Sequence, residues 1–391
     1  MATLRFTTAG ESHGPGLVAV LEGLPAGLEV TREDIDSDLA RRQLGHGRGG
    51  RMKIESDRAQ LWGGIRHGRT LGSPVALLVE NRDHANWSER MNPWPVDAEV
   101  EEVHLPRPGH ADLAGVLKFG HTDVRNVLER ASARETAARV AVGALAKVFL
   151  RELGVSVHSR VVRIGGVAAP AAEPSGPAGF EGVDESPVRC LDAAASTAMV
   201  AEIDRARKAN ESLGGIFEVH AYGVPPGLGS PVSWEERIDA RIAFAMMSIH
   251  AMKGVEIGDG FDLAFRDGSQ AHDEIFWDQD RGYVRETNRA GGIEGGMTTG
   301  APVVARVAMK PLPTLTKPLR SVDTETKQPA EALRERTDSC TVPAAGVVGE
   351  AMLALELARA ARDKFGGDAM SDVHAALAAY RERLDPGWGS S

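Results

Sequence analysis

Residues 107–136 read RPGHADLAGVLKFGHTDVRNVLERASARET, and this stretch joins a polar turn to the expected start of a long helix. The turn contains proline and glycine and presents His110 and Asp112. The stretch ends on Ser132 with Glu135 three residues later, which is the signature of a capping box. We therefore predict that a helix begins at Ser132 and continues through the sequence ARETAARVAVGALAKVFLREL.

The expected start of this helix is a candidate anion site. A helix N-terminus offers free N–H donors and the positive end of the helix dipole. Arg130 and Arg134 flank this one. An ordinary capped helix with solvent-facing arginines is the alternative interpretation, because capping boxes are common. The other motifs of the chain favour the anion site.

The composition is ordinary for a globular protein and argues against some classes of function. Of the 391 residues, 42% are hydrophobic and 26% are charged, and the net charge of −10 argues against general nucleic-acid binding. Cys190 and Cys340 lie too far apart for a CxxC metal site, so we expect a reducing, cytoplasmic setting and no metal. We also expect no signal peptide and no membrane partner, because long apolar runs are missing.

Two glycine-rich loops carry further candidate residues. The loop 9–16 holds Ser12 and His13 among glycines, although a loop histidine is often satisfied by backbone groups alone. The loop 41–53 matches the letters GxGxxG, but its glycines follow a helix rather than a strand, so we reject a dinucleotide fingerprint. Its positive charges suit an RNA-contacting loop or a mobile lid over an anionic substrate. The acidic net charge and the lack of aromatic residues favour the lid over the RNA contact, and a plain solvated loop is the remaining alternative.

The pattern of apolar residues predicts a mixed α/β protein without regular strand–helix alternation. The expected strands are residues 4–8, two between 18 and 30, 155–164, 215–222 and 303–309. Two helices are expected to start at Thr31, where Asp34 completes a capping box, and at Ser132. Four more are expected over 192–211, 234–252, 344–365 and 372–383. We interpret Met246, Met247 and Met252 as core residues. Trp87 and Trp94 should pack on a neighbouring element or a partner.

The reactive residues point to a ligand with several anionic groups. The motifs HExxH, GxSxG and GxxxxGK[ST] are missing, which disfavours a zinc hydrolase, a serine hydrolase and a P-loop kinase. Guanidinium groups suit carboxylates and phosphates, and histidine and aspartate can transfer protons near neutral pH. Arginines stand near every glycine-rich loop: Arg42, Arg48, Arg51, Arg107, Arg130, Arg134, Arg289 and Arg336.

A series of motifs, in order along nearly the whole chain, resembles the chorismate synthase family. They are AGESHG (9–14), GHGRGGRM (45–52), RPGHAD (107–112), ERASARET (129–136), KGVEIGDG (253–260), AGGIEGGM (290–297), KPLPT (310–314) and ERTDSC (335–340). His46 departs from this resemblance, because the family pattern has tyrosine there.

The resemblance implies a carbon–oxygen lyase of the shikimate pathway, which makes the precursor of the aromatic amino acids. It would convert 5-enolpyruvylshikimate 3-phosphate to chorismate and phosphate by 1,4-anti elimination. It would require reduced FMN without net redox change, because the departing hydrogen sits on a carbon that is not acidic. The substrate's phosphate and two carboxylates, together with the FMN phosphate, would account for the many arginines.

The resemblance also implies roles for individual residues. His13 would act as acid toward the departing phosphate, His110 would protonate or polarise the reduced flavin, and Asp338 would help to move a proton at flavin N5. The substrate would contact Ser12, Arg42, Arg48, Arg51, Arg107 and Arg134. FMN would contact Arg130, Ala131, Ser132, His250, Ala251, Gly295, Lys310, Pro311, Leu312, Pro313, Thr314 and Arg336.

The fold implied is α+β, a single large domain over 1–391 with helices sandwiched between antiparallel sheets, assembled as a homotetramer. The tail 386–391 should be frayed. Two rival functions remain open, an RNA-binding module with salt-sensitive affinity and a flavin-dependent oxidoreductase that uses NADPH. Because we see no separate dinucleotide domain, we expect an external flavin reductant, with NADPH at most an indirect one.

Overall fold

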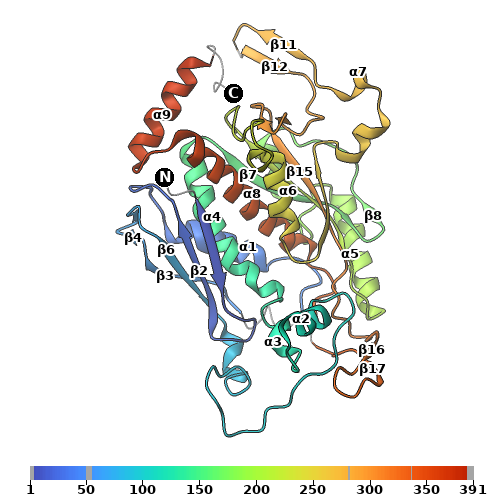
Figure 1. Ribbon diagram of the computed structural model, residues 1–391. Helices are drawn as coiled ribbons and strands as arrows, with labels where there is room; N and C mark the ends of the chain where they lie inside the picture. The colour runs from blue at the N-terminus through green and yellow to red at the C-terminus, as the bar shows by residue number, and fades with distance from the viewer. Residues whose placement is uncertain (1–3, 50–54, 281, 336, 385–391) are drawn as a thin grey trace.

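The computed structural model describes residues 4–49, 55–280, 282–335 and 337–384 and shows helices held between two larger antiparallel sheets (Figure 1). Helix α4 (Thr136–Glu152) contacts strands of both sheets, and helix α8 (Val342–Phe365) packs against the second sheet. Both helices are buried on nearly every side, as expected for helices enclosed by a protein core. The predicted α+β sandwich is therefore confirmed.

The first sheet has the strand order β1-β2-β6-β3, and its alternating apolar residues face the helices. Its strands are β1 (Arg5–Ala9), β2 (Gly16–Glu22), β6 (Val75–Glu80) and β3 (Ala59–Gly63). In β2, Leu17, Ala19 and Leu21 are buried, and each pairs with a buried residue of β6. Because side chains alternate between the faces of a strand, this register fixes which face is covered.

The second sheet has the order β10-β15-β9-β7-β8 and covers the other side of the helices. Its strands are β10 (Met252–Ile257), β15 (Val303–Met309), β9 (Gly215–Tyr222), β7 (Ser156–Ile164) and β8 (Val167–Ala168). The buried residues of both sheets and of the helices form one continuous apolar cluster that includes Leu4 and Leu377.

The other elements lie around this core. The helices are α1 (Arg32–Gln43), α2 (Asp112–Phe119), α3 (Arg125–Leu128), α5 (Ala193–Lys208), α6 (Ile238–Met247), α7 (Gly268–Ala271) and α9 (Met370–Arg383). The short strands are β4 (Ile65–Arg66), β5 (Arg69–Thr70), β11 (Ile275–Asp278), β12 (Gly282–Arg285), β13 (Ile293–Glu294), β14 (Met297–Thr298), β16 (Arg320–Val322) and β17 (Pro329–Glu331). None of the helices in the described ranges is long and apolar enough to cross a membrane.

Several local predictions are confirmed and others are wrong. The capping box of Thr31 and Asp34 forms as predicted. The second strand expected before residue 30 does not form, and only isolated bridges occur there. The helix expected over 234–252 is limited to α6, preceded by a 3-10 turn, and Met252 begins β10 instead. Met247 is 46% exposed rather than a core residue.

The long helix starts close to the predicted residue, but its N-terminal capping differs from the prediction. Ser132 caps a 3-10 turn over residues 133–135 that leads into α4, and its hydroxyl accepts from the backbone N–H of Arg134. The carboxylate of Glu135 does not complete a capping box. It accepts instead from the hydroxyl of Thr8, which packing of β1 brings to this turn, at 2.6 Å, and from Nε of Arg139, one turn further along α4, at 2.8 Å.

Replacing Gly143 by valine is expected to destabilise the protein. A Cβ atom at Gly143 would lie 2.3 Å from the Cβ atom of Ala351, so α4 and α8 would have to move apart. Overpacking of this kind costs about 1–3 kcal/mol, which urea unfolding would measure. Gly166→Val is the matched control, because nothing lies within 4 Å of a Cβ atom there. Unchanged stability of Gly143→Val would contradict the close helix contact.

Candidate active site

Predicted site residues gather where the loop after β1, the turn before α2, the end of α3, the segment 310–314 and Glu335 meet. This region lies beside the N-terminal end of α4 (Figure 1). The contacts below join several of the predicted residues, including both histidines, into one charged cluster.

His13 is held by a carboxylate at the end of α3. Its Nδ1 atom lies 3.0 Å from both carboxylate oxygens of Glu129, and its backbone N–H donates to Glu129 Oε2 at 2.9 Å. The backbone N–H of Ser12 donates to the Glu129 carbonyl at 3.0 Å. Burial would raise the pKa of Glu129, but the hydrogen bonds and charge of His13 and the charge of Arg125 outweigh it, so this pKa lies below its ordinary value. Glu129 is therefore an ionised anchor for the loop that carries His13.

His110 is held in a similar way by Asp112, which is fully buried at the start of α2. Asp112 accepts from His110 Nδ1 and from the backbone N–H and Nε of Arg107, the last two at 2.9 and 2.8 Å. Burial would raise the pKa of Asp112, but the bonds from His110 and Arg107 hold it well below the usual range. The turn predicted to present His110 and Asp112 thus has a buried ion pair at its centre.

Arg107 connects this turn to the last part of the chain. Its Nη1 atom donates to Thr314 Oγ1 and to Glu335 Oε2, both at 3.0 Å. Glu335 also lies 3.8 Å from Nη1 of Arg125, which in turn pairs with Glu129 at 2.9 Å. A continuous series of ion pairs therefore links His110 to His13.

The predicted flavin segment 310–314 lies against the same turn. Lys310 Nζ donates to the Gly109 carbonyl, and the Lys310 backbone N–H donates to the Ala251 carbonyl at 3.0 Å. Partial burial, together with the charge of Lys253, lowers the pKa of Lys310. Ala251 has a φ of 69°, an unusual conformation for a residue with a Cβ atom, and such strain is often found at functional sites.

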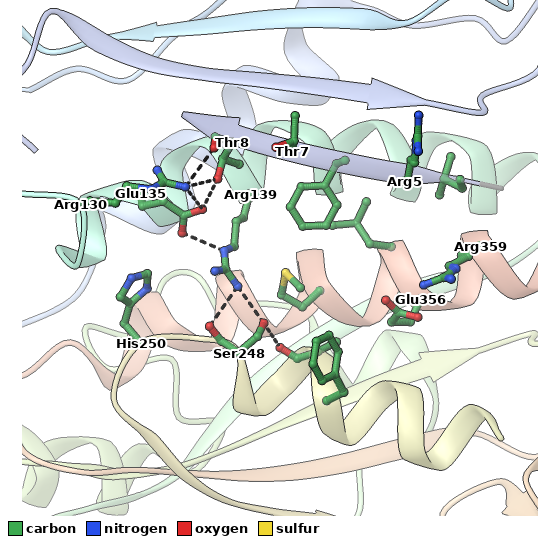
Figure 2. A pocket seen from close by; sticks show the side chains of 16 residues that line it. Arg5, Thr7, Thr8, Arg130, Glu135, Arg139, Ser248, His250, Glu356 and Arg359 are labelled. Carbon is green, nitrogen blue, oxygen red and sulfur yellow. Dashed lines mark hydrogen bonds and ion pairs between the residues drawn. The ribbon is translucent and has the colours of Figure 1, made fainter. Parts of the chain in front are cut away.

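A cavity of about 620 Å³ opens beside these segments, between β1, α4, α6 and α8 (Figure 2). Arg130 and His250 lie at one end, and Glu356 and Arg359 line the other. Arg130 is fixed by hydrogen bonds to Thr8 Oγ1 at 2.7 Å and to the Thr8 carbonyl at 3.0 Å. The volume falls within the range of roughly 300–1,000 Å³ that is usual for small-molecule sites.

His250 lines this cavity and has one buried polar atom that is unsatisfied. Its Nδ1 atom is buried and has no hydrogen-bond partner among the described residues. Burial is the largest influence on its pKa and lowers it to about 4; Arg139, His110 and Arg130 lower it further, and Glu135 opposes them. The imidazole is therefore neutral at pH 7 and can bind an uncharged polar group.

Asp338 lies against the arginine-rich loop. Its Oδ1 atom accepts from the backbone N–H of Gly49 at 2.5 Å, and its Oδ2 atom lies 3.2 Å from Arg48 Nη1. In the same loop, His46 pairs with Asp204 at 2.8 Å. Two predicted site residues, Arg51 and Arg336, lie outside the described residues.

Arg42 and Arg134 are each only 5% exposed and share the carboxylate of Asp57. Arg134 Nη1 lies 2.6 Å from Asp57 Oδ1, and Arg42 Nη1 lies 3.3 Å from Asp57 Oδ2. Arg42 belongs to the last turn of α1, so the predicted loop begins after Gln43 rather than at residue 41. In this arrangement both guanidinium groups bind protein acceptors, so direct substrate contact by either stays a prediction.

Gly295 is predicted to contact FMN, but no contact described above places it beside the other predicted flavin residues. It precedes Gly296, whose carbonyl accepts from the backbone N–H of Ile238 at the start of α6. His250 follows the other end of that helix, about 15 Å away at 1.5 Å per residue. A role for Gly295 therefore stays a prediction. The other predicted flavin residues lie on the segments already described: Ala131, Pro311, Leu312 and Pro313.

Sequence reasoning gave no role to several residues that shape this site. Glu129, Asp112 and Glu335 stand inside the motifs already quoted, and a buried arginine or histidine needs such an acid nearby. Asp57 and Trp87 lie outside those motifs. Trp87 stacks on His13 with ring centroids 4.1 Å apart. No local pattern points to either contact, because both join segments distant in sequence.

Comparisons with known proteins identify the family of this chain. A sequence model of the family described as chorismate synthase matches residues 4–361. A chorismate synthase of Desulforudis audaxviator is 59% identical over 382 residues, covering 97% of this chain and 98% of that protein. One of Rubrobacter xylanophilus is 58% identical over 381 residues, covering 97% of each.

A solved structure agrees over nearly the full length. Described as a crystal structure of chorismate synthase, it matches with a TM-score of 0.79 and 43% sequence identity, covering 98% of this chain and 99% of that one. This chain therefore belongs to the chorismate synthase family.

Proposed function

We propose that the charged cluster around His13 and His110, together with the adjoining cavity, carries out the family's reaction with reduced FMN. As a member of the family, the enzyme converts 5-enolpyruvylshikimate 3-phosphate to chorismate in the shikimate pathway and is a carbon–oxygen lyase. The observation that carries the assignment of the site is the series of ion pairs through Glu129, Arg125, Glu335 and Arg107, which joins both histidines.

The departing phosphate needs positive charge and a proton donor. We assign the role of proton donor to His13. Glu129 binds its Nδ1 atom, so the second ring nitrogen is the atom that can serve the substrate. Of the predicted substrate arginines, Arg107 lies 3.1 Å from His110 Nδ1, and Arg48 lies 3.2 Å from Asp338. The buried guanidinium groups of Arg42 and Arg134 add fixed positive potential, and Ser12 adds a hydrogen-bond donor.

The cavity fits FMN in its chemistry. Arg130 supplies a cation that suits a phosphate, and the unpaired, neutral His250 suits an uncharged polar edge of a ring system. Lys310 adds a further cation next to Ala251. Reduced FMN, when bound, supplies electron density that helps to expel phosphate and accepts the hydrogen lost from the substrate. This chain's residues bind it, exclude water and hold protons nearby.

His110 and Asp338 are the proposed proton-holding residues on the flavin side. Asp112 fixes one ring nitrogen of His110, which leaves the other to protonate or polarise the flavin. Asp338 is oriented by Gly49 and by Arg48, so its carboxylate has a set direction before ligands bind.

The remaining features of the proposal concern assembly and supply of electrons. We propose a single domain that forms a cytoplasmic homotetramer, with the arginine-rich loop that follows Gln43 as a lid and an external reductant for the flavin. Exposed apolar residues on the β11–β12 arm, which projects from the body in Figure 1, support self-association: Ile275, Trp277 and Tyr283.

Phosphate release should depend on reduced flavin. Anaerobic reactions with 5-enolpyruvylshikimate 3-phosphate would contain dithionite-reduced FMN, oxidised FMN or no flavin. We expect phosphate release and chorismate absorbance only with reduced FMN. Folded protein that releases no phosphate under any of these conditions would contradict the proposal.

Replacing His13 or His110 by alanine should slow turnover by about 10²- to 10⁴-fold, the usual contribution of general acid–base catalysis. FMN titration should show that the flavin still binds. His374→Ala is the matched control, because that residue lies on the outer helix α9, paired with Glu152, and should leave the rate unchanged. Near-full turnover of either test variant would remove that histidine from the chemistry.

Asp338→Asn should slow the chemical step while FMN affinity stays close to that of the wild type. The amide keeps the size of the side chain but loses the charge that pairs with Arg48. Single-turnover absorbance would measure the step and fluorescence titration the affinity. A large loss of FMN affinity would instead make Asp338 a structural residue.

A further inference from the structure

Trp87 lies directly against the candidate acid His13. It follows a 3-10 turn over residues 82–86, and its indole stacks on the His13 imidazole with ring centroids 4.1 Å apart and an interplanar angle of 24°. The same segment holds the backbone of His13, because His84 Nδ1 bonds to the His13 carbonyl at 2.8 Å. One segment therefore contacts both the ring and the backbone of His13.

The indole and Glu129 restrain different motions of the imidazole. Glu129 binds Nδ1 in the hydrogen-bonding direction, whereas stacking restrains the tilt of the ring plane. Arg125 lies over the Trp87 ring at 4.9 Å from its centroid and also pairs with Glu129 at 2.9 Å. Arg125 thus connects the two groups that hold His13, and Arg90 lies over the same indole at 5.7 Å.

These contacts also define the electrostatic surroundings of His13. An aromatic face attracts a cation, and the ionised Glu129 does the same from the edge of the ring. The charged and titratable side chains that contact His13 or these partners include Glu129, Arg125, Arg90, His84 and, through Arg125, Glu335.

We propose that Trp87 is a positioning residue for His13, holding the imidazole ring in the orientation needed for proton donation to the departing phosphate. The inference rests on the proposed role of His13. It gives the tryptophan a function in the reaction, although Trp87 would touch neither substrate nor flavin. Acid–base chemistry is sensitive to such orientation, since a displacement of about 1 Å can cost about 100-fold in rate.

Trp87→Leu and Trp87→Phe would test the proposal in the full-length enzyme with reduced FMN. We expect kcat to fall about 10- to 100-fold in Trp87→Leu, which keeps an apolar side chain but loses the ring. Phenylalanine should restore most of the rate, because it restores a stacking face. KM and FMN affinity should stay near wild type, which separates positioning from general loss of structure. Trp94→Leu is the matched control. Trp94 lies in the same loop and is 76% exposed, so its replacement should leave kcat unchanged.

A double-mutant cycle with His13→Ala gives the decisive comparison. If Trp87 acts through His13, Trp87→Leu should have no further effect on kcat once His13 is alanine. An equal fall in both backgrounds would overturn the proposal, as would full activity of Trp87→Leu.

The proposed function can fail separately from this inference. A wild-type enzyme without flavin-dependent phosphate release would refute the function. An active wild type with an active His13→Ala variant would refute the role of the histidine. An active wild type and an impaired His13→Ala variant with an unaffected Trp87→Leu variant would refute only the positioning role.

Discussion

Buried carboxylates that each bind two basic side chains are the constraint on which this site depends. Asp57 binds Arg42 and Arg134, Asp112 binds Arg107 and His110, and Glu129 binds Arg125 and His13. A buried cation without such a partner would be costly, and removal of one partner from a buried pair usually costs 3–5 kcal/mol. The carboxylates therefore fix the arginines and histidines before a ligand arrives. Polyanionic substrates then meet donors that need little rearrangement, which is the form of preorganisation that stabilises developing charge most effectively.

The same principle anchors the helical layer behind the site. Glu350 of α8 is fully buried and accepts from Arg41, Lys147, Arg189 and Ser159. Burial would raise its pKa, but the charges of Lys147, Arg41 and Arg189 outweigh this and keep it well below the ordinary value. Because Arg41 precedes Arg42 in the last turn of α1, this cluster also fixes where the arginine-rich loop leaves the core. The close contact of Gly143 with Ala351 then holds α4 against the helix that carries Glu350.

Features with a local cause could be predicted from the sequence, and those with a distant cause could not. Strand β9 matches its predicted range, and the Thr31 capping box forms, because a few neighbouring residues determine each. The box at Ser132 fails since β1 brings Thr8 to Glu135. The motifs contain most residues of the charged cluster, including both histidines, yet they gave no role to Asp57 or Trp87. Their partners Arg134 and His13 lie far away in the chain, so only the folded structure shows what they contact.

These long-range contacts have a consequence for how the enzyme folds during its synthesis. The bond between Glu129 and His13 joins residues 116 positions apart, that between Lys310 and Gly109 spans 201, and that between Arg107 and Glu335 spans 228. Contacts of such separation require large loops to close, and they form late and slowly in folding. A nascent chain therefore lacks the segment that joins its two histidines until residue 335 has been made. Competence for the reaction then arises in one step with completion of the fold, rather than growing gradually as the chain is synthesised.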